Sequence, residues 1–86
     1  MAQYEIQFKA SAAKEFRKLP LEIKTRLQKA INALKVEPRP TGMKKLVGED
    51  DLHRIRVGDY RVIYEIDDDI QSVTVIRIRH RREAYQ

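Results

Sequence analysis

The clearest alternation of hydrophobic and polar residues lies in residues 52–66, whose sequence is LHRIRVGDYRVIYEI. Side chains point alternately to the two faces of a strand, so a period of two predicts β-structure. The dipeptide Gly58-Asp59 interrupts the alternation, and it is typical of a two-residue hairpin turn. We therefore predict two antiparallel strands joined at this turn, with Arg54 and Arg56 on one face of the first strand.

Apolar spacing on either side of this hairpin predicts two helices and three further strands. Tyr4, Ile6 and Phe8 alternate with polar residues, which predicts a strand near the N-terminus. The segment after the hairpin is rich in Val and Ile, which favour strands. In chain order, the expected elements are a strand over 3–9, helices over 12–18 and 21–36, a short strand over 44–47, the hairpin strands over 52–57 and 60–66, and a last strand over 72–79.

The two helices have recognisable end signals and one apolar stripe. Ser11 is a candidate N-cap of the first helix, since its hydroxyl can accept a hydrogen bond from a free backbone N–H. Pro20 ends that helix and suits the first turn of the next one. Apolar residues recur at helical spacing in the second helix and form one stripe: Ile23, Leu27, Ala30, Ile31 and Leu34.

The order β-α-α-β-β-β indicates an α+β fold, with a helical hairpin packed on one face of a small antiparallel-rich sheet. A chain of 86 residues suits one small domain, so we take residues 1–86 as a single domain. The sequence contains no cysteine, which excludes disulfides and thiolate zinc sites. It shows neither a signal-peptide pattern nor an apolar run long enough to span a bilayer, so we expect a cytoplasmic protein with no membrane partner.

Charge is distributed unevenly along the chain, and the net charge indicates which kinds of molecule the protein binds. The net charge is +5, which points to nucleic acid or to an acidic protein partner. Acidic residues in the middle of the chain gather in two predicted turns, 49–51 and 67–69, and leave the strands basic. Three consecutive carboxylates in a turn diverge rather than converge, so the second cluster predicts no metal site.

Arginine dominates one face of the predicted sheet. Ile76 and Ile78 are expected to share the face of the last strand that is opposite the arginines. Such a face is either solvated, with charges that discourage edge pairing, or it binds an anion, since the guanidinium fork matches phosphate oxygens. Mutual repulsion among so many cations favours the anionic partner. The six arginines expected on this face are Arg54, Arg56, Arg61, Arg77, Arg79 and Arg81.

Two histidines and a tyrosine near the C-terminus are further candidates for chemistry. His53 falls on the same face as Ile55 and Val57, so we predict a packing or edge residue rather than a proton-transfer group. His80, at the end of the last strand, is a candidate general acid or base because histidine is the residue type most suited to proton transfer at neutral pH. Tyr85 can either stack on an unpaired base or cover the sheet edge.

The hairpin run, followed by VTVIRIRHRREAY, resembles the RelE/ParE superfamily of toxins from bacterial and archaeal toxin–antitoxin modules. The resemblance covers nearly the whole chain, and it includes Lys-Lys-Leu before the hairpin, the pattern R-I-R-x-G-x-Y-R and the ending H-R-x-x-x-Y. That ending is similar to the RelE branch rather than to the gyrase-poisoning ParE branch. The resemblance implies a RelE-like fold.

The resemblance also implies an activity: a toxin that cleaves mRNA in the ribosomal A site as an endoribonuclease and so inhibits translation. In such enzymes the ribose 2′-OH attacks the adjacent phosphate, and no metal or other cofactor takes part. By the same resemblance Arg61 binds the phosphate, Arg81 contacts it or assists the leaving group, and Tyr85 stacks on or orients a base. The implied catalytic set is Arg54, Arg56, Arg61, Arg81 and Tyr85, with His80 as a further candidate, and the implied RNA-binding residues are Lys44, Lys45, Arg77, Arg79 and Arg82.

Two departures from the family pattern affect these expectations. Arg54 and Arg56 stand where well-known members of the family carry lysines, and an arginine is a poor general base because it keeps its proton in proteins. Either the base is then His80, Tyr85 or a ribosomal group, or this protein cleaves more slowly than those members. Gln86 directly follows Tyr85, so we do not expect antitoxin control through displacement of a C-terminal helix.

The expected partners are a cognate antitoxin, in a heterotetramer or a larger complex, and the ribosome with its mRNA. By the resemblance, the antitoxin wraps the toxin and neutralises its basic face, and DNA is bound only through the antitoxin. Two other functions stay open at this point. One is a ParE-like poison of DNA gyrase that cleaves nothing, and the other is a non-catalytic corepressor that binds the antitoxin.

Overall fold

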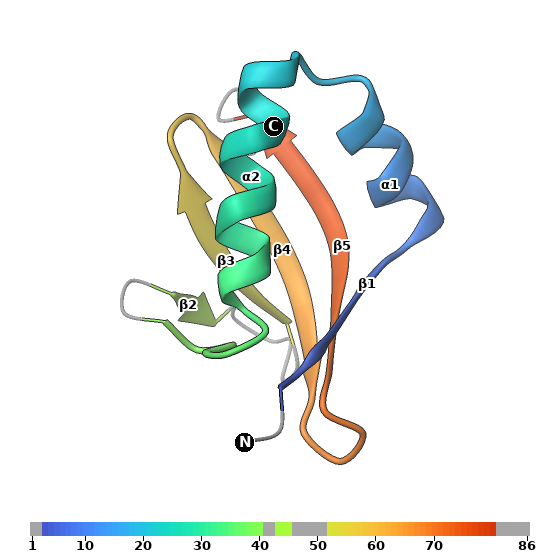
Figure 1. The fold of residues 1–86 in the computed structure, drawn as a ribbon, viewed down its shortest axis with the longest axis vertical. Coiled ribbons are helices and arrows are strands. Elements are labelled where there is room, and N and C mark those ends of the chain that lie inside the picture. The colour runs from blue at the N-terminus through green and yellow to red at the C-terminus, as the bar shows by residue number, and fades with distance from the viewer. Residues whose placement is uncertain (1–2, 41–42, 46–51, 81–86) are drawn as a thin grey trace.

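Two helices lie on one side of a five-stranded sheet in a computed structural model of the chain (Figure 1). The structure describes residues 3–40, 43–45 and 52–80. The predicted α+β class and the predicted order of helices and strands are confirmed. In chain order the elements are β1 (Glu5–Phe8), α1 (Ala10–Arg17), α2 (Leu21–Ala33), β2 (Lys44–Lys45), β3 (Leu52–Val57), β4 (Tyr60–Asp67) and β5 (Ser72–His80).

The sheet has the strand order β1-β5-β4-β3-β2, so the first strand lies beside the last one. β1 runs parallel to β5, whereas the other neighbouring strands are antiparallel. The two helices carry the chain from the β1 edge of the sheet to the β2 edge. Gly58 in the β3–β4 turn has a φ of 59°, a left-handed conformation that glycine adopts without steric cost, and the predicted hairpin is confirmed.

The hydrophobic core lies between α2 and the sheet. Leu27 and Ile31 of α2 are fully buried, and Leu34 is buried just beyond the end of the helix. The predicted apolar stripe is therefore confirmed as the face of α2 that packs on the sheet. The sheet contributes buried side chains mainly from β4 and β5: Val62, Tyr64, Ile66, Val73, Val75 and Ile78.

Tyr64 joins this core to the segment that follows α2. Its hydroxyl donates a 2.8 Å hydrogen bond to the carbonyl oxygen of Pro38, and both residues are buried. Burial raises the pKa of Tyr64 from 10.0 to about 12. Because folding raises this pKa, the stability linked to the neutral phenol is complete below pH 10 and is lost as the pH rises toward 12.

We expect Tyr64→Phe to lower the free energy of unfolding by about 1–2 kcal/mol, because the buried carbonyl of Pro38 loses its hydrogen-bond donor. Urea titration at neutral pH measures this change. The same substitution at the partly exposed Tyr60 is the control and should cost less. Equal losses in the two variants would contradict a stabilising role for the Tyr64 hydroxyl.

The predicted N-cap of the first helix is wrong. α1 begins at Ala10 with Lys9 as its N-cap, and Ser11 is an exposed residue inside the first turn. The Lys9 N–H donates to the Val75 carbonyl, and the Lys9 carbonyl accepts from the Ala13 N–H, both at 2.9 Å. Lys9 thus makes both the last backbone hydrogen bond between β1 and β5 and the first hydrogen bond of the helix. The helix therefore follows β1 directly, with no intervening residue that could serve as a side-chain cap.

Two further predictions differ from the structure: one concerns the residue at which a helix ends, and the other concerns the face of a strand on which a side chain lies. α2 ends at Ala33 rather than at 36, because the next three N–H groups bond to carbonyls three residues back, in a tighter turn. Ile76 and Ile78 do not share a face as predicted: the β4–β5 register shifts by one residue, so that Val75 and Ile78 are buried while Ile76 is partly exposed. Of the predicted strand 44–47, residues 44–45 form β2, and 46–47 lie outside the described residues.

The acidic turn between β4 and β5 is held by its own carboxylates. Asp67 Oδ1 accepts hydrogen bonds from the Asp69 and Ile70 N–H groups. Asp68 accepts a 2.6 Å hydrogen bond from the Tyr4 hydroxyl and two from the Arg39 guanidinium, at 2.8 and 3.2 Å. The Arg39 guanidinium and then the Tyr4 hydroxyl lower the pKa of Asp68. These carboxylates therefore hold the turn and connect it to Tyr4, just before β1, and to the segment after α2.

Candidate functional site

The face of the sheet that is turned away from the helices carries rows of basic side chains. Arg61 of β4 lies directly opposite Arg56 of β3 on one side and opposite Arg79 of β5 on the other. Directly opposed residues point to the same face, with Cβ atoms about 4.5–5.5 Å apart. Arg56, Arg61 and Arg79 therefore form one cross-strand row, which we call the arginine row.

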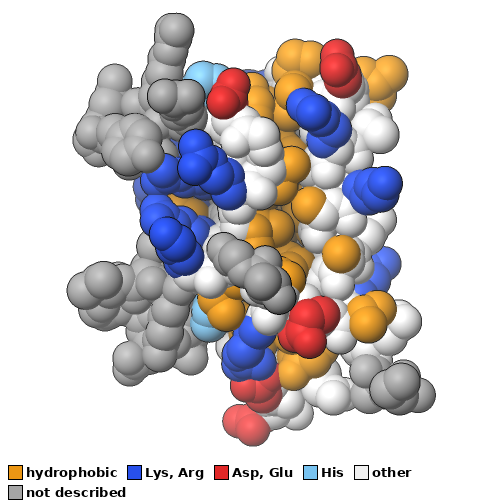
Figure 2. Space-filling view, turned by 90° about the vertical axis from the view of Figure 1, so that its left-hand side faces the viewer, with side chains coloured by type: hydrophobic (Ala, Val, Ile, Leu, Met, Phe, Trp, Pro, Cys, Tyr) orange, Lys and Arg blue, Asp and Glu red, His pale blue; other side chains and the backbone are white. Residues whose placement is uncertain are grey.

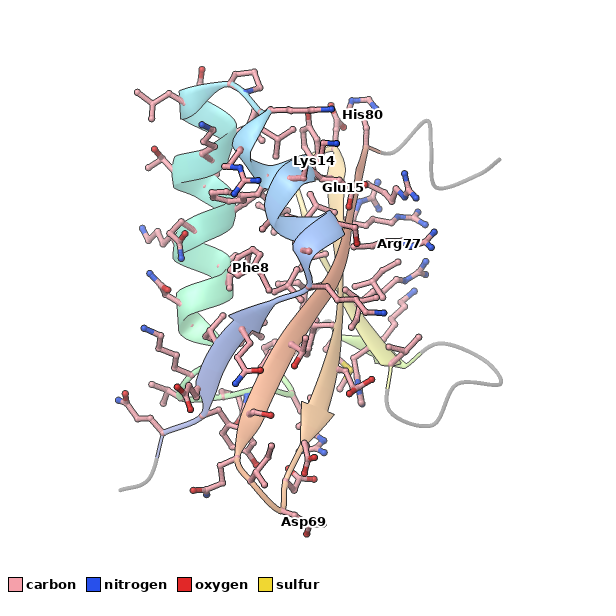
Figure 3. All side chains as sticks on the ribbon, turned by 90° about the vertical axis from the view of Figure 1, so that its right-hand side faces the viewer. Phe8, Lys14, Glu15, Asp69, Arg77 and His80 are labelled. Atoms are coloured by element: carbon pink, nitrogen blue, oxygen red, sulfur yellow. The ribbon has the colours of Figure 1, made fainter. Side chains whose placement is uncertain are left out.

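A second row of basic residues runs beside the arginine row. Arg54 is opposite Lys44 on β2 and Ile63 on β4, and Ile63 is opposite Arg77 on β5. Figure 3 shows Arg77 projecting from the sheet on the side away from α2. Of the predicted site residues, the structure thus brings Lys44, Arg54, Arg56, Arg61, Arg77 and Arg79 onto one face.

A small hollow lies among these side chains at the β2–β3–β4 end of the face. Its volume is about 100 Å³, and it is lined by Lys44, Arg54, Ile55, Arg56 and Arg61. Figure 2, which views the molecule from the side of β2 and β3, shows Lys and Arg side chains gathered there. A hollow of this size and charge suits a single phosphate group, because arginine presents paired N–H donors to two oxygens at once.

Like charges directly opposite one another destabilise a sheet. In the arginine row three guanidinium groups stand on three adjacent strands, and each keeps its charge at any physiological pH. An anion placed against the row relieves this repulsion. The row has the charge and the donors that an anion requires, but it offers no group that could accept a proton.

The two histidines lie on the helix side of the sheet. His53 is buried and its ring stacks on Tyr64 with 5.8 Å between ring centroids, which confirms the predicted packing position. His80 is opposite Tyr60, and the two rings meet edge to face at 5.1 Å. Since neighbouring residues of a strand point to opposite faces, the structure does not bring His80 into the arginine row beside Arg79.

Several predicted site residues lie outside the part of the chain that the structure describes. They are Arg81, Arg82 and Tyr85, together with the side chain of Lys45, whose backbone in β2 pairs with that of His53 in β3.

Residues of α1 extend the basic face in a way that the sequence analysis missed. A second hollow, of about 310 Å³, lies between α1 and β5 and is lined by Ser11, Lys14, Glu15, Lys18, Arg77 and Arg79. Ser11, Lys14 and Glu15 of α1 and its C-cap residue, Lys18, are spaced i, i+3, i+4 and i+7, so they follow one face of the helix. The sequence alone could have indicated this polar stripe from the spacing of its residues. Its position beside the strand that carries the arginines comes from the structure.

Comparisons with known proteins show what the chain is similar to. A family model described as the ParE toxin of the type II toxin–antitoxin system parDE matches residues 6–85. A toxin RelE of Mycobacterium tuberculosis is 32% identical over 84 residues, which cover 96% of this chain and 87% of that toxin. The chain belongs to the RelE/ParE superfamily. Together these matches make it a RelE-family toxin of a type II toxin–antitoxin system, and the ParE-like alternative is not favoured.

Solved RelE structures share the fold of this RelE-family chain. The isolated RelE toxin of E. coli superposes with a TM-score of 0.81 at 30% identity, over 90% of this chain and 83% of that one. The archaeal RelE–RelB complex of Pyrococcus horikoshii gives a TM-score of 0.81 at 29% identity, over 91% and 94% of the two chains. The predicted RelE-like fold is thus confirmed. Among the described helices, none is long and apolar enough to cross a membrane.

Proposed function

We propose that this RelE-family toxin is an endoribonuclease that cleaves mRNA in the A site of the ribosome and so stops translation. The arginine row is the observation that carries this proposal. It concentrates three permanent cations on one face, beside a hollow that suits one phosphate. The family membership supports the same activity, because the implied phosphate-binding residue, Arg61, is the central member of the row.

The proposed reaction is an attack of the ribose 2′-oxygen on the adjacent phosphorus. The O2′–P bond forms, the P–O5′ bond breaks, and the products are a 2′,3′-cyclic phosphate and a free 5′-hydroxyl. A base takes the 2′-OH proton, and an acid donates a proton to the departing 5′-oxygen. The arginine row stabilises the additional negative charge on the non-bridging oxygens, and fixed charge of this kind is often the largest catalytic contribution.

Proton transfer needs groups other than the arginine row. Arg54 and Arg56 cannot serve as bases, and His80 has its ring against Tyr60 on the helix side of the sheet. In this proposal the base is therefore Tyr85 or a group of the ribosome, which would explain dependence on the ribosome. Arg81 contacts the phosphate or assists the leaving group, and Lys44, Lys45, Arg77 and Arg82 hold the RNA on either side.

The proposed partner of the resting toxin is a cognate antitoxin. Several structural neighbours of this chain are RelE–RelB toxin–antitoxin complexes, from Pyrococcus horikoshii and E. coli among others. An antitoxin segment that lies over the basic face would neutralise it and exclude mRNA. DNA binding then belongs to the complex, in a heterotetramer or larger assembly, through the antitoxin.

The alternatives predict a different first effect in cells. After induction of the toxin, incorporation of labelled amino acids is expected to fall within minutes, while thymidine incorporation continues for longer. A gyrase poison would reverse this order, and a corepressor without catalytic activity would affect neither. Early loss of DNA synthesis would contradict the proposed function.

A further inference from the structure

Beyond Val75, the edge of β5 that faces away from β4 has α1 beside it in place of β1. β1 pairs with β5 from Glu5 opposite Ser72 to Phe8 opposite Val75, and the chain then turns into α1 at Lys9. Backbone N–H groups beyond that point need other partners, because a buried donor without an acceptor is costly. Figure 3 shows α1 packed beside this part of β5, with Glu15 between helix and strand.

The two carboxylate oxygens of Glu15 have different partners on β5. Oε1 accepts a hydrogen bond from the backbone N–H of Ile78 at 3.3 Å. Oε2 lies 3.4 Å from Nη1 of Arg79. The side chains of Glu15 and Arg79 are 29% and 34% exposed, so water screens this ion pair less than it would a fully exposed one. One carboxylate thus holds the strand edge and the guanidinium of the next residue together.

Arg79 is the member of the arginine row on β5, directly opposite Arg61. An arginine side chain is long and loses much rotamer freedom when it is fixed, and repulsion from Arg61 would favour conformations that leave the row. Glu15 opposes both effects from the far side of Arg79. We propose that Glu15 is a positioning residue, which holds the Arg79 guanidinium in place for the phosphate. This inference rests on the proposed nuclease function.

A purely structural role for Glu15 is the competing explanation, and Glu15→Gln separates the two. The glutamine carbonyl can still accept the Ile78 N–H, so the strand edge keeps its partner. The amide has no charge and turns its NH₂ group toward Arg79, so the ion pair is lost. The substitution also makes the face more positive, which by itself should strengthen binding to RNA.

The test measures single-turnover mRNA cleavage on programmed ribosomes over a range of toxin concentrations, with the full chain. For Glu15→Gln we expect a maximal rate about tenfold lower than wild type, because misplacement of a positioned group slows the chemical step. The half-saturating concentration should stay the same or fall, and the melting temperature should stay close to that of wild type. Glu5→Gln, which removes the same charge from an exposed position on β1, should leave the maximal rate unchanged.

An unchanged maximal rate in Glu15→Gln would overturn the positioning role. A lower rate that is fully explained by a smaller folded fraction, as judged from the melting temperature, would overturn it as well. An RNA-free measurement distinguishes this failure from failure of the nuclease proposal. The Arg79 Nε–H signal in ¹⁵N NMR spectra, assigned with Arg79→Lys, should report an ordered side chain in wild type and a mobile one in Glu15→Gln. If the signal responds as expected but wild type cleaves no mRNA, the proposed function fails; if wild type cleaves and the signal is unaffected, the role of Glu15 fails.

Discussion

Replacing Arg61 by alanine is expected to slow single-turnover mRNA cleavage by about 100- to 1000-fold, the usual cost of removing one donor that stabilises transition-state charge. Arg61 is the central member of the arginine row, with Arg56 and Arg79 directly opposite it on the two neighbouring strands. It also lines the hollow that suits a phosphate. Among the residues that the structure describes, no other member of the row has a guanidinium neighbour on both sides, so the effect should be the largest at this position.

The fold should tolerate this change, because Arg61 is a partly exposed residue on the open face of the sheet. Removing one of three opposed cations should leave the melting temperature the same or raise it. Arg26→Ala, which removes the same side chain from the exposed surface of α2, is the matched control and should cleave like wild type. Cleavage by Arg61→Ala at the wild-type rate would remove the arginine row from the mechanism.

Replacing Leu27 by alanine is expected to lower the free energy of unfolding by about 2–5 kcal/mol, the range measured for such core truncations. Leu27 is fully buried in α2 and packs in the core between that helix and the sheet. A small domain is stable by only about 5–15 kcal/mol, so this one change removes a large share of the total. Urea denaturation monitored by circular dichroism measures the loss.

The same helix offers a matched control for this prediction. Leu21 lies in the first turn of α2 and is 78% exposed, so Leu21→Ala removes the same atoms without leaving a cavity. Its expected effect is within about 0.5 kcal/mol. Similar losses of stability in the two variants would contradict the assignment of the core to the stripe that contains Leu27, Ile31 and Leu34.

The sequence was sufficient to predict features that depend on local periodicity. The turn at Gly58 fixes the register of the β3–β4 hairpin, and the alternation around it then places Arg56 and Arg61 on one face. The spacing of Leu27, Ile31 and Leu34 likewise identifies the buried face of the second helical segment. Each of these inferences needs only residues that are close together in the chain.

Features that join distant segments could not be predicted in this way. The position of Arg79 opposite Arg61 depends on the register of β5, which contains a one-residue shift that no periodic pattern indicates. The contact of Glu15 with Arg79 depends on where β1 stops pairing with β5. Glu15 and Ile78, which meet at the same place, are 63 residues apart in the chain. Both are consequences of hydrogen bonding between strands and of helix packing, which a single sequence does not encode locally.

The most direct test of the proposed function is to map the cleaved ends of mRNA after a single turnover on purified ribosomes that carry a defined codon in the A site. The proposed function predicts one cut within that codon, with a 2′,3′-cyclic phosphate on the upstream fragment and a 5′-hydroxyl on the downstream one. We expect this cut with wild type and with Arg26→Ala, but hardly at all with Arg61→Ala. Intact mRNA after incubation with wild type, or equal cleavage by Arg61→Ala, would contradict it.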